Sequence, residues 1–293
     1  DVETFEKGYR AYLDKVVAEI QASLPPKKQS PAEIEKAYLA DTDNSEKTAA
    51  FAASLLEQEN FAKARELATK SLKKNEREPS SAVVMAKLAM RSEDVDGAIA
   101  HLEKALDRKK PHREVLSLLA ALKLREKDFD AAGVLYELGR KTFTYDDQWL
   151  KGAAVVHLKA GDEKQLTVVL EQLAARDADD VLVRKRLAAS KLKAADYAGA
   201  VRYGREAIYI DVLDAEIHRM LAEAHRGLKQ HARAVRESEV ALSLKPGDNE
   251  IELDLARSLL AAGMKKAAKQ RVESILKRRP DHPGAKALLE TLN

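Results

Sequence analysis

The side chains that could carry metal or hydrolytic chemistry are scattered along this sequence. Its seven histidines form no H-E-x-x-H pair, the spacing that places two zinc ligands on one helical face. The chain has no cysteine, which excludes disulfides, thiolate catalysis and cysteine-bound metals. Neither a G-x-S-x-G elbow nor a glycine-rich phosphate loop is present. We therefore predict no catalytic residue, no metal site and no cofactor.

Charged side chains are the remaining candidates, because they make up 34% of the 293 residues and give a net charge of +3. Acidic and basic residues alternate along most of the chain, as they do on solvated helical faces. The positive charge is concentrated in residues 181–293. One basic cluster there could contact nucleic acid, but it lacks the interleaved aromatic residues that stack on bases, and a solvated face is favoured. The cluster is Lys265, Lys266, Lys269, Arg271, Lys277, Arg278 and Arg279.

Small and apolar residues show which elements must position these charges. Residues 215–248 have apolar or small residues three or four apart in two runs, which predicts two helices joined by a polar turn. Pro246 closes the stretch, and Pro280 follows it by 34 residues. With that period, units begin at Ser45, Pro79, Arg113, Asp147, Val181, Ala215 and Asn249. Position 8 of the units is then Ala52, Ala86, Ala120, Ala154, Ala188, Ala222 and Ala256, and position 20 is Ala64, Ala98, Ala132, Leu166, Ala200, Ala234 and Ala268.

The pattern resembles the tetratricopeptide repeat family, whose period is 34 residues of helix–turn–helix. Alanine at positions 8 and 20 suits that resemblance, because small residues let helix axes approach to about 8 Å. The resemblance implies an all-α fold, a right-handed α-α superhelical solenoid. It also implies three parts. These are a degenerate helical N-terminal cap or connector at 1–44, seven repeats at 45–282, and a C-terminal capping helix at 283–293.

Two details of this organisation follow from single residues. Residues 2–20 and 31–40 are each amphipathic, and Pro25 and Pro26 predict a break between them. Just before the fourth unit, Gly139 and Arg140 stand at positions 27 and 28 of the third unit, where the second unit has Ala105 and Leu106. We expect the loosest joint of the array at residues 139–147.

The resemblance further implies that first helices line a concave groove. The predicted peptide-binding residues are the basic residues on that face: Lys87, Arg91, Lys151, Lys185, Arg186, Arg219, Arg226 and Arg257. Lys151, Lys185 and Arg219 share position 5 of consecutive units. Cations in the middle of a helix gain nothing from its dipole, so a row of them would focus a field toward a negative ligand. Position 13 cations such as Arg91 have a structural alternative, because they stand near helix C-termini.

Position 12 adds an apolar stripe to the same face. It consists of Leu56, Met90, Leu124, Leu158, Leu192 and Leu260, interrupted by Arg226. The stripe could be a shelf for a ligand or part of the core between repeats. No asparagine occupies position 6 or 9 of a first helix, so the chain does not match the carboxylate-binding members of the family. We expect a non-catalytic interaction scaffold that binds an acidic and apolar peptide segment or partner protein.

Other assignments stay open. The helix expected at residues 2–20 also resembles the connector that follows the catalytic domain in some multidomain metallopeptidases. The chain begins at Asp1 rather than methionine. It could then be the recruitment or oligomerisation arm of a larger exported enzyme, in a bacterial periplasm rather than a cytoplasm. A homo-oligomer is a further alternative. No apolar run reaches the roughly 20 residues that span a bilayer.

Overall fold

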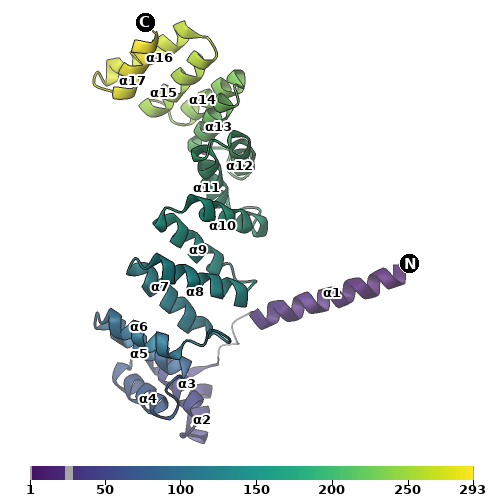
Figure 1. Ribbon diagram of the computed structural model, residues 1–293, viewed down its shortest axis with the longest axis vertical. Helices are drawn as coiled ribbons and strands as arrows, with labels where there is room; N and C mark the ends of the chain where they lie inside the picture. Colours follow the sequence, from purple (N-terminus) through teal and green to yellow (C-terminus); the bar gives the residue numbers. More distant parts are fainter. Residues whose placement is uncertain (1, 24–28, 293) are drawn as a thin grey trace. The chain divides into compact units, whose positions relative to one another are not determined.

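The computed structural model describes residues 2–23 and 29–292, with the backbone alone at 19–23 (Figure 1). Every regular element in these ranges is a helix, so the predicted all-α class is confirmed. The described chain divides into two compact units, of which the first ends at Asp162 and the second begins at Glu163. The predicted break at Pro25 and Pro26 lies outside the described residues.

The helices of the first compact unit are α1 (Val2–Ser23), α2 (Pro31–Ala40), α3 (Ser45–Glu57), α4 (Phe61–Lys74), α5 (Pro79–Arg91), α6 (Val95–Ala105), α7 (Arg113–Arg125), α8 (Phe129–Thr142) and α9 (Gln148–Ala160). Those of the second compact unit are α10 (Glu163–Arg176), α11 (Val181–Lys193), α12 (Tyr197–Ile210), α13 (Ala215–Gly227), α14 (His231–Leu244), α15 (Asn249–Ala261), α16 (Lys265–Arg278) and α17 (Pro283–Leu292).

Helices pack in pairs, and the pairs stack. In the first compact unit, α3 pairs with α4, α5 with α6 and α7 with α8; in the second, α11 pairs with α12, α13 with α14 and α15 with α16. First helices also contact the first helix of the next pair, as α13 contacts α11 and α15. The first helices of these pairs begin at residues that are predicted repeat starts. α9 begins at Gln148, one residue after the predicted start at Asp147.

Alanine permits this close stacking. The position 8 alanines are fully buried except Ala154, which is half-buried, and all seven position 20 residues are buried, including Leu166. Larger side chains such as Leu119, Leu187 and Leu221 fill the space around them. The one half-buried alanine lies in α9, whose start is displaced by one residue.

The turn between the two helices of a pair has a fixed conformation. The residue at position 15 of each predicted unit has a left-handed backbone, with φ between 56° and 78°. Those residues are Glu59, Glu93, Lys127, Gly161, Ala195, Lys229 and Gly263. The next residue caps the second helix in four cases, where an Asn or Asp side chain accepts a hydrogen bond from the backbone three residues on. A cap of this kind satisfies one of the free N–H groups at the helix start.

The joint expected to be loosest is well packed. Trp149 is fully buried at the start of α9, its ring stacks on Phe143 at 5.5 Å between centroids, and it also lies against Tyr136. Gly139 leaves the space that this indole fills, because a Cβ there would lie 2.0 Å from the Trp149 ring. The glycine that suggested a weak point is therefore a packing requirement. The boundary between the compact units lies about one helix further on, at Asp162.

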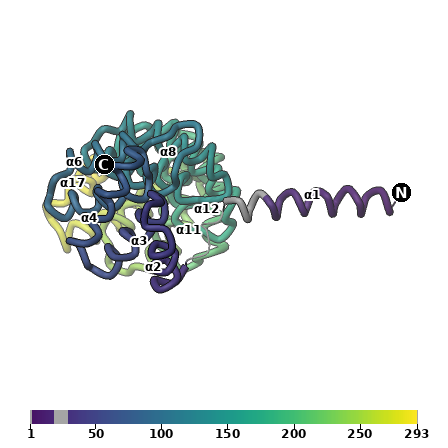
Figure 2. Tube along the Cα trace, turned by 90° about the horizontal axis from the view of Figure 1, so that it is seen from below, coloured from purple at the N-terminus to yellow at the C-terminus, as the bar shows by residue number. Residues whose placement is uncertain are grey.

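The two ends of the described chain differ in burial. α2 lies beside α3 (Figure 2). The two helices pack through a stacked pair, Tyr38 and Phe51, whose ring centroids are 5.0 Å apart. At the other end, α17 packs on α15 and α16, with Ala285 buried. In contrast, the large apolar side chains of α1 are exposed. Those described are Val2, Phe5, Tyr9, Tyr12, Leu13 and Val17, at 40–75% exposure.

Candidate binding surfaces

The predicted groove residues of the first compact unit do not act alike. Lys87 pairs with Glu114, one repeat later, at 2.6 Å. The guanidinium of Arg91 lies over the ring of Phe61, 4.1 Å from its centroid, so it has a structural contact. Lys151 is exposed and has no ion pair among the described residues. Of these three, Lys151 alone keeps the free positive charge that the prediction required.

In the second compact unit, Lys185 and Arg186 lie on α11. The Lys185 ammonium contacts the Asp214 carboxylate at 2.5 Å, and both side chains are largely buried. Burial is the largest single influence on the pKa of Asp214 and would raise it. The hydrogen bond and charge of Lys185, together with hydrogen bonds from the backbone N–H groups of Glu216 and Ile217, outweigh burial and hold that pKa below its usual value. Arg186 lies 3.5 Å from Glu163. Glu163 also accepts a hydrogen bond from Lys193, which holds its pKa below the usual value.

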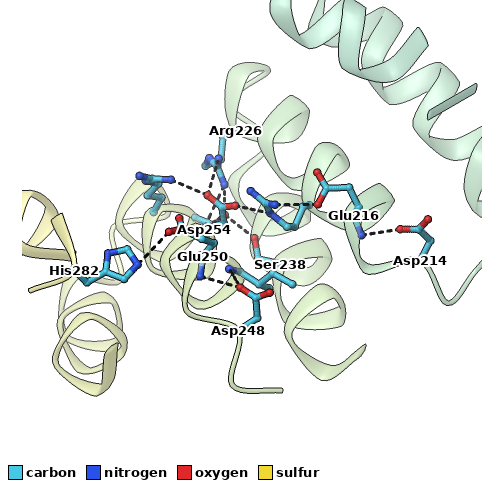
Figure 3. A network of polar contacts seen from close by, with 12 residues as sticks. Asp214, Glu216, Arg226, Ser238, Asp248, Glu250, Asp254 and His282 are labelled. Atoms are coloured by element: carbon cyan, nitrogen blue, oxygen red, sulfur yellow. Dashed lines mark hydrogen bonds and ion pairs between the residues drawn. The ribbon is translucent and has the colours of Figure 1, made fainter. Parts of the chain in front are cut away.

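The other three predicted groove residues meet at one carboxylate (Figure 3). Asp254 on α15 has a side chain only 10% exposed, and Arg219 and Arg257 each donate to it at 2.9 Å. Arg226 donates to the Asp254 carbonyl at 3.3 Å and to Ser258 Oγ at 3.0 Å. We call Arg219, Arg226, Arg257 and Asp254 the Asp254 cluster. It joins α13 to α15 and is part of the packing between repeats.

Burial and charge act in opposite directions on these arginines. Burial lowers the pKa of Arg226. Burial is also the largest single influence on the pKa of Arg219 and would lower it, but the hydrogen bonds to and charges of Asp254 and Glu216 together outweigh burial and raise that pKa. A buried carboxylate flanked by guanidinium groups is stabilised only while its partners remain. The Asp254 cluster is therefore an interlocked set of charges rather than a free positive field.

The predicted positive wall is thus neutralised by the chain itself at most of its positions. Some of these carboxylates lie about one repeat further on: Glu114 follows Lys87 by 27 residues, and Asp254 follows Arg219 by 35. Others precede their partners, as Asp254 precedes Arg257 and Glu163 precedes Arg186. The 34-residue register contains this signal, because an acid near the same position of the next unit is a neighbour in a stacked array. The positions of the cations alone do not reveal these carboxylate partners.

The apolar stripe at position 12 is mostly part of the packing. Its members are half-buried in both compact units, except Leu158, which is 44% exposed. Two cations of the basic cluster on α16 are likewise engaged, since Arg271 and Arg278 both contact the buried carboxylate of Glu252. Neither feature provides a continuous ligand surface.

A stronger apolar surface lies where α11 begins and α12 ends, and sequence reasoning missed it. Its five side chains are Leu182, Tyr209, Ile210, Val212 and Leu213, with 37–81% exposure. Because α11 and α12 form a hairpin, the start of one lies beside the end of the other, and the Lys185–Asp214 pair ties them together. We call these five residues the apolar patch.

The sequence feature that could have revealed the apolar patch is the composition of the turn at residues 211–214. Turns 75–78, 177–180 and 245–248 read Asn-Glu-Arg-Glu, Asp-Ala-Asp-Asp and Lys-Pro-Gly-Asp, whereas turn 211–214 reads Asp-Val-Leu-Asp. Exposed turns are normally polar, and neighbouring large apolar side chains that remain exposed indicate a contact surface. The patch is therefore a candidate for binding another protein.

A cavity forms a second candidate binding surface in the same compact unit. A cavity of about 350 Å³ lies between α12 and α14, above α13. It is lined by Val201, Arg205, Ile208, Tyr209, Leu221, His225, Arg233, Arg236 and Glu237. Tyr209 belongs to both the cavity and the apolar patch. His218 joins them too, because its Nε2 lies 3.1 Å from the Val212 carbonyl and its Nδ1 lies 2.7 Å from Glu237.

Comparison with known proteins supports the family expected from the sequence. Residues 55–122 and 225–292 match the tetratricopeptide repeat family. These two regions are therefore similar to tetratricopeptide repeats. No curated protein matches the sequence.

Solved structures share the fold. A crystal structure of MamA is 16% identical with a TM-score of 0.52, and the match covers 57% of this chain and 91% of MamA. MamA from Desulfovibrio magneticus RS-1, from residue 41 to its end, is 17% identical with a TM-score of 0.51, over 58% of this chain and 97% of MamA. A chain in the structure of Naa15/Naa10 bound to HypK-THB is 16% identical with a TM-score of 0.56, over 89% of this chain but 40% of its own. At these identities the likeness concerns the fold alone.

None of the described helices is both long and apolar enough to cross a membrane. No group of three or more His, Cys, Asp or Glu side chains in residues 2–23 and 29–292 is arranged to hold a metal ion.

Proposed function

We propose that this chain is a non-catalytic interaction scaffold and that it binds a partner protein through the apolar patch. The observation that carries the proposal is the exposure of Leu182, Val212 and Leu213 at 60–72%, beside Tyr209 at 81%. Removing apolar surface of this kind from water contributes about 25 cal/mol per Å² to binding, and the loss of freedom on association offsets part of that gain. The neighbouring helices support the patch, because α11 packs on α10 and both α11 and α12 pack on α13.

The partner is expected to present apolar side chains with acidic residues beside them. Acidic residues suit this end of the unit because Arg205, Arg233 and Arg236 lie around the cavity that shares Tyr209 with the patch. The groove residues first expected to attract an acidic peptide support the proposal less well, because Lys185, Arg219 and Arg257 already pair with carboxylates of the chain.

Site-specific photo-crosslinking tests the proposal. A photoreactive phenylalanine analogue replaces Tyr209 in one variant and Leu39, which is 66% exposed on α2, in a matched control. We expect a covalent adduct with one partner protein from position 209 and none from position 39, in extract of the source cells. The variant L182S/L213S should then bind the isolated partner at least tenfold more weakly, while L39S/M264S binds normally. Equal adducts from both positions, or no loss in L182S/L213S, would contradict the proposal.

A further inference from the structure

The cavity between α12 and α14 has an apolar base and a cationic rim. Leu221 is 1% exposed, and Val201 and Ile208 are half-buried beside it. Arg205 from α12 and Arg233 and Arg236 from α14 are exposed at its edge. Its volume of about 350 Å³ is within the range of about 300–1,000 Å³ that small-ligand pockets occupy. Such a cavity suits a ligand with an apolar part and a negative group.

The three arginines of the rim have no carboxylate partner in the described part of the chain. The carboxylate that lines the cavity, Glu237, is held instead by His218 at 2.7 Å. The one contact of the rim arginines with a polar side chain joins Arg233 to the Gln230 amide oxygen at 3.1 Å. The three arginines therefore give the cavity a net positive charge, which the Glu237 carboxylate offsets only in part.

This arrangement does not stabilise the fold. Arg233 stands in the first turn of α14, where a positive charge opposes the helix dipole. Arg236 follows three residues later on the same helix, a spacing at which like charges repel. Burial lowers the pKa of His225 in the cavity wall, and the charges of Arg233 and Arg205 lower it further. An anion in the cavity would relieve all three of these interactions.

We propose that this cavity binds a phosphoryl group carried on an apolar or aromatic group. A phosphate monoester has a charge of about −1.5 to −2 near neutral pH and three acceptor oxygens, so it compensates three guanidinium groups better than one carboxylate does. Guanidinium forks also match phosphate in geometry and bind it with two parallel hydrogen bonds. Tyr209 and Ile208 offer contact area for the attached apolar group.

The site is independent of the apolar patch, because its charged residues come from α12 and α14 and only Tyr209 is shared. The phosphoryl group has two sources that fit the same chemistry. One is a phosphorylated side chain in a peptide segment, and the other is a small phosphate ester. Titration with a phosphotyrosine peptide flanked by leucines and with phenyl phosphate separates them, because tighter binding of the peptide indicates a peptide segment and equal binding indicates the small ester.

Calorimetric titration of the whole chain with phenyl phosphate in about 150 mM salt tests the site. At that salt concentration the Debye length is about 8 Å, which suppresses diffuse attraction. We expect binding by the native chain and at least tenfold weaker binding by R205Q/R233Q/R236Q. The variant K265Q/K266Q/K277Q removes the same charge from the exposed face of α16 and should bind as the native chain does.

A second readout keeps the test decisive if the triple variant folds poorly. Bound phosphate should raise the pKa of His225, followed by NMR titration, because a nearby negative charge favours the imidazolium. R205Q alone, which removes an exposed side chain, should weaken binding in the same direction. The proposal is overturned if phenyl phosphate does not bind, if the α16 variant loses as much affinity as the cavity variant, or if benzoate binds as tightly as phenyl phosphate.

Discussion

The second compact unit contains two groups of three arginines whose situations are opposite. Arg219, Arg226 and Arg257 converge on the buried Asp254, whereas Arg205, Arg233 and Arg236 surround a cavity whose one carboxylate is held by a histidine. The first group lies on first helices, where the resemblance placed a ligand groove. The second lies on second helices. Whether a cation is free to bind a ligand therefore depends less on which helix carries it than on whether the chain supplies a carboxylate partner.

The largest expected effect comes from removing the shared carboxylate. Asp254 is only 7% exposed, and Asp254→Ala leaves Arg226 and Arg257 without this counter-charge and Arg219 with Glu216 alone. We expect a loss of about 3–5 kcal/mol in the free energy of unfolding, measured by urea denaturation. Glu239→Ala, on the exposed face of α14, is the control and should change stability by less than about 0.5 kcal/mol. Similar midpoints for the two variants would remove the distinction between the two groups.

A smaller loss is expected one contact away. Ser258 Oγ accepts a hydrogen bond from Arg226 at 3.0 Å and lies 2.8 Å from Ser238 Oγ, which is buried. Ser258→Ala would leave both groups without this partner, at a cost of about 1–3 kcal/mol. Replacing both serines with alanine should cost less than the sum of the single changes. A fully additive double variant would show that the two hydroxyls do not interact.

The position 5 cations should separate according to their partners. Lys185→Ala breaks the largely buried pair with Asp214 and should cost about 1 kcal/mol. Lys151→Ala removes an exposed side chain that has no such pair, and we expect a change below about 0.5 kcal/mol. Thermal denaturation of the two variants measures the difference. If Lys151→Ala lowers the stability more than Lys185→Ala does, the position of the lysine in the repeat has a larger effect on stability than its ion pair.

The smallest expected effect concerns how the free energy of unfolding depends on pH. The pKa of His225 is lowered from its ordinary 6.5, so the unfolded chain binds this proton more tightly than the folded chain does. Stability from this group is therefore complete above pH 6.5 and decreases as the pH falls toward the folded pKa. In R205Q/R233Q the folded pKa should move back toward its ordinary value, and the decrease should become smaller. Unfolding curves between pH 8 and pH 5 provide the comparison, and an unchanged difference would mean that burial alone sets this pKa.

The sequence predicted the repeating architecture because that architecture depends on local rules. Alanines such as Ala188 and Ala222 recur at the point where helices approach, and Asp94 and Asp128 precede second helices that they cap. The ion pairs were harder to predict. The pairs Lys87–Glu114 and Arg219–Asp254 join residues 27 and 35 apart, and these partners become neighbours only after the repeats have stacked.

Two other features show why the rest was missed. Gly139 suggested a weak joint, yet it makes room for Trp149, a residue ten positions later whose orientation no periodic pattern specifies. The apolar patch breaks the normal rule that turns are polar, so a rule-based interpretation passed over Val212 and Leu213. The cavity near them depends on the spacing of α12 and α14 above α13 rather than on a motif.

The left-handed residue in the turn of each helix pair has a consequence for folding cooperativity. Left-handed backbone costs a residue with a side chain about 1–2 kcal/mol, which glycine avoids, as at Gly161 and Gly263. Glu59, Glu93, Lys127, Ala195 and Lys229 each retain that cost in a different repeat. Stability in a stacked array is close to a sum of single-repeat and neighbour-contact energies. A series of single glycine replacements would therefore stabilise one repeat at a time, and it could place a chosen boundary between folded and unfolded repeats without altering a side chain of the Asp254 cluster or the cavity.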